Sequence, residues 1–211
     1  MKNLNKVALF DFCGTVVSLQ TADSFTSFVL KREKKYIPYL LTLLFQNKFY
    51  LFIKYKLLRN TKSNKYRMLK YLKGITRKQI FKYSIEFARY LKDLKIKNVD
   101  THFQNLSDDE DIKIFIISAG YECYIKEFYG EEVKVIANKF IFDEGYFTGE
   151  IEGNDCIGNE KIKRLSKEID LDLIDRENSY AYSDSLSDLP LFQLVKNNYF
   201  IKGNSIEKFK L

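Results

Sequence analysis

The chain has 211 residues, of which 45% are hydrophobic and 30% are charged, so it can bury a core and is neither disordered nor low in complexity. Its three cysteines, Cys13, Cys123 and Cys156, form no CxxC pair, which argues against a disulfide framework or a zinc site and favours a reducing, cytoplasmic setting. The net charge is +7, and the single histidine, His102, leaves a histidine-based catalytic mechanism with almost no support.

Several short apolar runs predict buried strands. They lack polar alternation, which is typical of parallel strands covered on both faces, and they lie at residues 6–11, 113–118, 133–137, 179–183 and 198–202. Residues 139–152 predict a hairpin, and helical patterns separate the later runs at about 121–129, 159–169 and 187–195. The predicted fold class is therefore α/β, with a central parallel sheet covered by helices.

Residues 21–105 differ from the rest of the chain. Their patterns are helical, with breaks near Asn60, Gly74 and Asn98, so we predict an all-helical basic cap inserted into a core formed by residues 1–20 and 106–211. From Lys31 to Lys97 there are 20 Lys and Arg against three acids, a charge of +17, which leaves −10 for the remainder. Such a division indicates two parts with different partners.

Within this cap, residues 36–58 combine leucines and isoleucines with seven aromatics and three lysines. The unbroken apolar part is too short to span a bilayer. One interpretation is that the segment packs inside the cap. The other is that it contacts an anionic membrane peripherally, which would place the protein at the inner membrane surface. Nucleic acid is a weaker candidate, because the aromatics lie within the apolar run and do not alternate with charges.

Polar side chains follow three of the predicted strands. Asp11 opens the string DFCGT, Ser118 ends the second run, and Asp184 and Asp188 lie in the string YSDSLSDLP. Lys161 lies at the start of a predicted helix. Because ligands of open α/β sheets bind at the carboxyl ends of the strands, we expect these side chains to converge on one crevice.

This ordered set closely resembles the four motifs of the haloacid dehalogenase superfamily, and the order of parts resembles its phosphoserine-phosphatase-like branch, subfamily IB. The resemblance spans nearly the whole chain and implies a Rossmann-like core, an Mg²⁺ cofactor and phosphoryl transfer through an aspartyl-phosphate on Asp11. It implies that the metal ligands are Asp11, the backbone carbonyl of Cys13 and Asp184. Asp188 would bind the metal through water or would contact these ligands without binding the metal.

The resemblance also assigns roles around the phosphoryl group. Ser118 and the amide of Ala119 would donate hydrogen bonds to its oxygens, Lys161 would neutralise its charge, and Thr15 would orient Asp11. Each residue has an ordinary alternative. Ser118 could simply end a strand, Lys161 could be a surface lysine, and the acids could cap a helix.

One position departs from the family pattern. Two residues after the nucleophile, most phosphatases of the superfamily have an aspartate that protonates the leaving oxygen and then activates water, whereas this chain has Cys13. Such a carboxyl typically contributes about 10²–10⁴-fold in rate, and a protonated thiol is a poor base. The protein is then an enzyme whose substrate has a good leaving group, or one that takes the acid from the substrate or the cap. The alternatives are a slow phosphotransferase, a degenerate phosphate-binding protein, or an enzyme of another reaction class within the superfamily.

The substrate is constrained by a second departure. In phosphoserine phosphatases an acidic residue nine positions after the nucleophile receives the substrate ammonium, but Gln20 occupies that position here, which disfavours free phosphoserine. Gln20 and Asp23 are still expected to face the substrate. A basic, apolar cap suits a phosphorylated lipid, sugar or other metabolite, so the expected partner is a small-molecule or lipid phosphomonoester.

Overall fold

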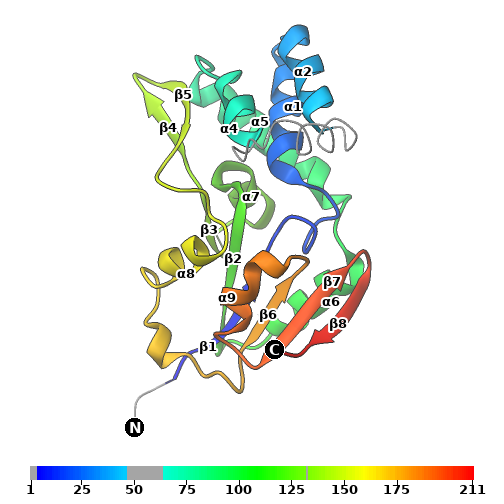
Figure 1. The fold of residues 1–211 in the computed structure, drawn as a ribbon, viewed down its shortest axis with the longest axis vertical. Helices are drawn as coiled ribbons and strands as arrows, with labels where there is room; N and C mark the ends of the chain where they lie inside the picture. Colours follow the sequence, from blue (N-terminus) through cyan, green and yellow to red (C-terminus); the bar gives the residue numbers. More distant parts are fainter. Residues whose placement is uncertain (1–3, 47–63, 132) are drawn as a thin grey trace, which may run out of the picture.

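The computed structural model describes residues 4–46, 64–131 and 133–211. A six-stranded sheet with the order β3-β2-β1-β6-β7-β8 occupies the lower half of the molecule in Figure 1. Its strands are β1 (Lys6–Phe10), β2 (Ile112–Tyr121), β3 (Lys134–Asn138), β6 (Tyr180–Ser183), β7 (Asn197–Lys202) and β8 (Ser205–Phe209). Neighbouring strands pair in parallel, except that β8 runs antiparallel to β7. The predicted α/β fold class is confirmed.

Helices cover both faces of this sheet. They are α6 (Lys97–Ser107) and α7 (Glu122–Tyr129) on one side, and α8 (Asn159–Leu165) and α9 (Leu189–Phe192) on the other, with short 3₁₀ turns at Leu171–Leu173 and Leu186–Asp188. In β1, Ala8 and Phe10 join the core cluster beneath α6 and α7, whereas Val7 and Leu9 join the cluster beneath α8 and α9. Burial on both faces explains why the apolar runs show no polar alternation.

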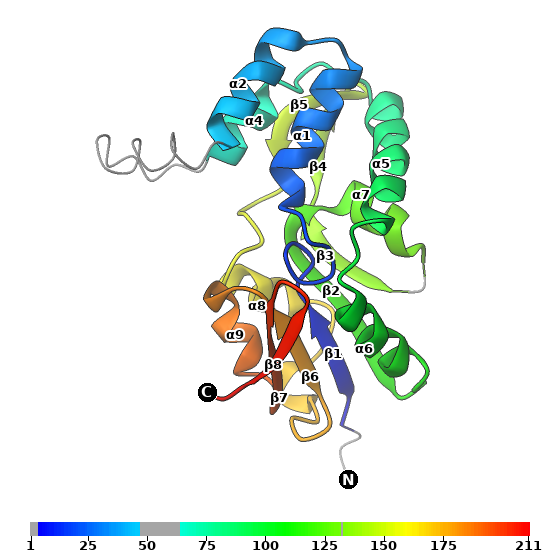
Figure 2. The same ribbon diagram turned by 90° about the vertical axis from the view of Figure 1, so that its right-hand side faces the viewer.

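The insertion lies at the carboxyl end of the sheet (Figure 2). Among the described residues from 21 to 95 it contains no strand, and its helices are α1 (Thr21–Arg32), α2 (Tyr36–Gln46), α4 (Asn64–Lys70) and α5 (Arg77–Lys92). Thr76 fixes the start of α5, because its hydroxyl accepts a hydrogen bond from the Gln79 amide while the Gln79 side chain accepts one from the Thr76 amide.

The predicted hairpin is present and extends the cap. It consists of β4 (Phe140–Asp143) and β5 (Tyr146–Ile151), and β5 packs along α4. Backbone bonds fasten it to the turn before α5, with the Gly74 amide donating to the Phe147 carbonyl at 2.9 Å and the Phe147 amide donating to the Ile75 carbonyl at 2.8 Å. A segment that lies between β3 and β6 in sequence therefore joins the insertion in space.

Helix α6 packs on the sheet, although the predicted domain division groups it with the insertion. The ring centroids of Phe103 and Phe10 are 5.4 Å apart, and the His102 Nδ1 lies 3.2 Å from the Tyr182 hydroxyl. Val99 and Phe103 supply the buried face of this helix. The division into residues 21–105 and the remainder stays a prediction. Helix α6 contacts the sheet of the predicted core.

The segment at 36–58 is described only in part. Residues 36–46 form α2, as the helical pattern predicts, and the rest of the segment lies outside the described residues. No helix in the described ranges is long and apolar enough to cross a membrane.

We expect Phe103→Ala to lower the free energy of unfolding by about 3–5 kcal/mol, because it removes a buried ring that packs on Phe10 and Tyr129. Urea denaturation followed by circular dichroism measures this loss. Phe81 on α5 is 54% exposed, so Phe81→Ala is the matched control and should change stability by less than about 0.5 kcal/mol. A loss below about 1 kcal/mol for Phe103→Ala would contradict the packing of α6 on the sheet.

Candidate active site

The carboxyl ends of β1, β2 and β6 meet below the insertion, where a cavity of about 360 Å³ opens. Its lining includes the predicted residues Asp11, Cys13, Gln20, Asp23, Ser118, Ala119, Lys161, Asp184 and Asp188, together with Ala22, Lys65, Asp155, Ile157, Ser185 and Ser187. Thr15, also predicted, is completely buried behind this wall. A larger hollow of about 780 Å³ beside α6 and α7 contains none of the predicted residues. The strand-end residues therefore share one cavity, while their individual roles stay predictions.

Lys161 lies between two buried carboxylates. Its ammonium is 2.8 Å from Asp11 Oδ1 and 2.7 Å from Asp188 Oδ2, and none of the three side chains is more than 8% exposed. Ser183 donates a further hydrogen bond to Asp188 Oδ2 at 2.7 Å. Asp11 follows β1, Lys161 lies in the first turn of α8 and Asp188 follows β6, so the sheet order brings these distant residues together.

Burial and mutual charge set the protonation of this cluster. Loss of solvent raises the pKa of Asp11 to about 6, with Lys161 opposing the rise and Asp188 adding to it. Burial alone would lower the pKa of Lys161, but Asp11 and Asp188 hold it above its ordinary value, so Lys161 stays charged. Burial also raises the pKa of Asp184, with a contribution from Asp188. Additional positive charge near these acids would favour their ionised forms.

Thr15 and Gly14 bring Asp184 against the first strand. The Thr15 hydroxyl accepts a hydrogen bond from the Asp184 amide at 3.0 Å, and it lies 3.5 Å from Asp11 Oδ2 and 3.4 Å from Asp184 Oδ1. Gly14 has a φ of +75°, and a Cβ there would lie 2.1 Å from Asp184 Oδ2. Only glycine permits this close approach, which explains the glycine in the string DFCGT.

Ser118 lies in a bulge, where the sequence analysis predicts the end of a strand. Ile117 pairs with Ile136 and Tyr121 pairs with Asn138, so β2 continues to Tyr121 while residues 118–120 leave the regular ladder with β3. Ser118 is completely buried, and its Oγ accepts a hydrogen bond from the Gly120 amide at 3.0 Å. The bulge turns the Ser118–Ala119 segment toward the cavity.

Cys13 is held by residues that the sequence analysis did not identify. Its Sγ lies 2.9 Å from the Thr21 hydroxyl, which lies 2.7 Å from the Tyr124 hydroxyl, and Tyr124 in turn accepts a hydrogen bond from the Tyr121 amide. Burial, with the nearby Asp11 carboxylate, raises the pKa of the Cys13 thiol, so the thiol is protonated near neutral pH. These contacts arise where α1 meets α7, and no local sequence pattern signals them.

The insertion contributes Asp23 and Lys65 to the cavity wall, and Gln20 lies just before it. Gln20 is exposed, Asp23 is half-buried, and burial raises the pKa of Asp23. The sequence does not predict that Lys65 on α4 lines the cavity. Its ammonium lies 2.6 Å from Asp155 Oδ1, and its side chain is 9% exposed. Most other described Lys and Arg residues of the insertion are exposed, so little of the predicted positive charge lines the cavity.

The strand-end oxygens suit Mg²⁺. Among the described residues, no three His, Cys, Asp or Glu side chains are grouped as a metal site. The family resemblance gives Asp11, Asp184 and the carbonyl of Cys13 as the protein ligands. Asp188 Oδ1 is buried and has no hydrogen-bond partner among the described residues, a costly state that a cation or its bound water would relieve. Because Mg²⁺ keeps several waters and takes only one or two carboxylates, this donor set fits the ion.

Comparison with known proteins identifies the family. The pattern of the haloacid dehalogenase-like hydrolases matches residues 8–193. A protein of unknown function from Bordetella pertussis Tohama I shares the fold, with 22% identity, a TM-score of 0.70, and coverage of 92% of this chain and 89% of that chain. A phosphoserine phosphatase in a phospho-aspartyl intermediate analogue form is 21% identical, with a TM-score of 0.55 and coverage of 92% and 85%.

A phosphoserine phosphohydrolase-like protein from Francisella tularensis subsp. tularensis SCHU S4 is 18% identical, with a TM-score of 0.54 and coverage of 92% of this chain and 85% of that chain. None of the curated proteins compared with the chain matches it. Because the family pattern runs from β1 to α9 and includes the insertion and the cavity residues, the chain belongs to the haloacid dehalogenase-like hydrolases, and its fold is that of their phosphoserine-phosphatase-like members.

Proposed function

We propose that the protein is a magnesium-dependent phosphatase or phosphotransferase that acts on a phosphomonoester through an aspartyl-phosphate on Asp11. The observation that carries this proposal is the buried Asp11 carboxylate at the end of β1, which lies 2.8 Å from Lys161 and shares a cavity with Ser118. Membership of a hydrolase family supports it, as does the fold shared with phosphoserine phosphatase.

The reaction divides into two displacements at phosphorus. An Asp11 oxygen first attacks, the bond to the leaving oxygen breaks, and that oxygen takes a proton. Water or an acceptor hydroxyl then attacks, the bond to Asp11 breaks, and the carboxylate is restored. The Lys161 ammonium and the Ser118 hydroxyl oppose the charge that develops on the phosphoryl oxygens. Bound Mg²⁺ would supply further charge neutralisation for the same group.

Cys13 is poorly suited to the acid and base roles that this mechanism requires. A buried, protonated thiol can donate a proton but is a poor base, so activation of water is the step that it serves least well. Asp23 lines the same cavity and is the first candidate for a substitute acid from the cap. The alternative function is a catalytically degenerate protein that binds phosphate without turnover, and Cys13 is the observation that favours it.

We expect Cys13→Asp to raise phosphate release from p-nitrophenyl phosphate by about 10-fold or more, because it restores a carboxyl acid and base. Asp11→Asn should abolish release in either background, since an amide cannot attack phosphorus. Phosphate release over time measures both effects. An unchanged rate in a folded Cys13→Asp variant that still binds Mg²⁺ would show that the proton comes from another group. No release from either the natural protein or Cys13→Asp would support the degenerate alternative.

We expect Mg²⁺ to bind the natural protein, and Asp184→Asn to weaken that binding by about 10-fold or more, because it removes a ligand charge. Isothermal titration calorimetry with MgCl₂ measures this without any substrate. Asp143→Asn, in the exposed hairpin, removes the same charge away from the cavity and should leave the affinity unchanged. Equal affinities for the natural protein and the folded Asp184→Asn variant would place the ion elsewhere.

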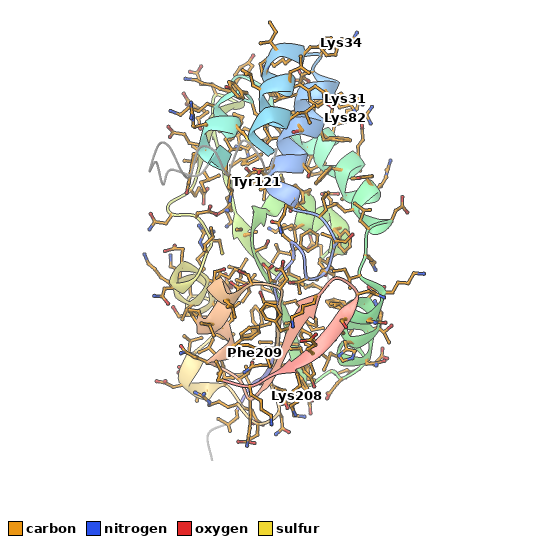
Figure 3. All side chains as sticks on the ribbon, turned by 45° about the vertical axis from the view of Figure 1, so that its right-hand side comes forward. Lys31, Lys34, Lys82, Tyr121, Lys208 and Phe209 are labelled. Atoms are coloured by element: carbon orange, nitrogen blue, oxygen red, sulfur yellow. The ribbon has the colours of Figure 1, made fainter. Side chains whose placement is uncertain are left out.

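We further propose that the substrate is a phosphorylated lipid, sugar or related metabolite, and that the cap contacts an anionic membrane surface. Tyr36, Ile37 and Leu40 on α2 are 60%, 76% and 57% exposed, which supports an apolar contact. Figure 3 shows Lys31 and Lys34 at the same end of the insertion, far from the sheet. Apolar side chains beside lysines match a negatively charged lipid surface.

We expect the protein to sediment with vesicles of phosphatidylcholine that contain phosphatidylglycerol, and to bind pure phosphatidylcholine vesicles less. Ile37→Glu should reduce sedimentation with the anionic vesicles by about 10-fold, since it places a charge in the apolar contact. Phe81→Glu, at another exposed apolar site in the cap, is the matched control and should bind as the natural protein does. Equal sedimentation of both variants, or none for the natural protein, would exclude a membrane contact through α2.

A further inference from the structure

Lys65 reaches from the insertion into the bulge that holds Ser118. Its ammonium lies 2.6 Å from the Ala119 carbonyl and 2.6 Å from Asp155 Oδ1, and 5.5 Å from the centre of the Tyr121 ring. Lys65 belongs to α4, whereas Ala119 belongs to β2 and Asp155 to the loop before α8. One buried side chain therefore connects the cap with two segments of the cavity wall.

Asn138 at the end of β3 completes this connection. Its side-chain amide donates to the Ala119 carbonyl at 2.8 Å and to Asp155 Oδ1 at 2.7 Å, while its Oδ1 accepts from the Cys156 amide at 3.1 Å. The bulge takes residues 118–120 out of the regular ladder, so a buried carbonyl there needs other donors. Lys65 and Asn138 are those donors for Ala119.

This arrangement fixes the peptide between Ala119 and Gly120 on both sides. Its carbonyl is held by the two donors, and its N–H, on Gly120, donates to Ser118 Oγ at 3.0 Å. Because a peptide is planar, holding the carbonyl also sets the direction of the N–H. A serine hydroxyl has one proton, so an Oγ that already accepts from Gly120 can direct its proton at another acceptor.

We propose that Lys65 is a positioning residue that fixes the Ala119–Gly120 peptide and thereby aims the Ser118 hydroxyl at the phosphoryl group. The inference rests on the proposed phosphoryl transfer and adds that the rate of this transfer depends on the position of the cap. Lys65 donates to the bulge only while α4 lies over it, so the Ser118 geometry is complete only when the cap is in place. Among the described basic residues of the insertion, Lys65 is thus the one expected to matter for turnover, and the exposed ones are not required.

Lys65→Met tests this directly. With p-nitrophenyl phosphate and Mg²⁺, kcat should fall by about 10-fold or more while KM changes little, because the lost hydrogen bond acts through Ser118 in the transition state. Asp155→Asn keeps the Lys65–Ala119 contact and should cost clearly less in kcat. Arg32→Met removes one positive charge and an ion pair with Glu86 elsewhere in the cap, and it should leave both constants unchanged.

A purely structural ion pair would give a different pattern, in which Lys65→Met and Asp155→Asn lose stability equally and keep the natural kcat. That pattern would overturn the proposal. The amide resonance of Gly120 provides a readout without activity: Lys65→Met should shift it, and an unchanged resonance in the folded variant would also contradict the proposal. If the natural protein neither releases phosphate nor forms a phosphorylated Asp11, the proposed function fails, whereas a shifted Gly120 resonance would still establish the Lys65 contact.

Discussion

The contact of one buried lysine with two buried aspartates is the interaction on which the site depends. Lys161 touches Asp11 and Asp188 at 2.8 and 2.7 Å. Taking each ion out of water costs several kcal/mol, and the cost is recovered only with close geometry and additional hydrogen bonds. Ser183 and Thr15 supply such bonds. Since the cluster joins the ends of β1 and β6 to α8, it can form only if these strands are neighbours and α8 packs beside their ends.

The cluster also supports the proposal that an anionic ligand binds here together with a metal ion. One ammonium faces the carboxylates of Asp11 and Asp188, with Asp184 beside them, so the strand ends alone are short of positive charge. The bulge at Ser118 adds neutral donors on the opposite wall, and the insertion reaches that wall through Lys65. The oxygens proposed to bind the metal therefore follow β1 and β6, whereas the donors proposed to bind phosphate lie in the bulge of β2. The cap contacts both groups of residues, through Lys65 at the bulge and through Thr21 at Cys13.

Much of this arrangement could be predicted from the sequence, and particular residues show why the rest could not. Asp11, Ser118 and Asp184 could be predicted because each follows an apolar run, and Lys161 because it begins a predicted helix within the same ordered set of motifs. Lys65 could not, since its contact depends on how α4 lies over a bulge and no pattern separates it from the other lysines. The bulge could not be predicted either, because the run KIFIIS continues without a break to the residue where the bulge begins. Strand β8, a short edge strand of exposed and half-buried residues, gives too weak a pattern to predict.

The central claim is that Asp11 accepts the phosphoryl group, and trapping that group tests it most directly. The protein would be mixed with p-nitrophenyl phosphate and Mg²⁺, quenched in acid, digested and analysed by mass spectrometry. The account predicts a phosphoryl group on the peptide that contains Asp11, and specifically on that residue, with none in Asp11→Asn. Phosphate release by the natural protein with no modified Asp11, together with continued release by Asp11→Asn, would contradict it.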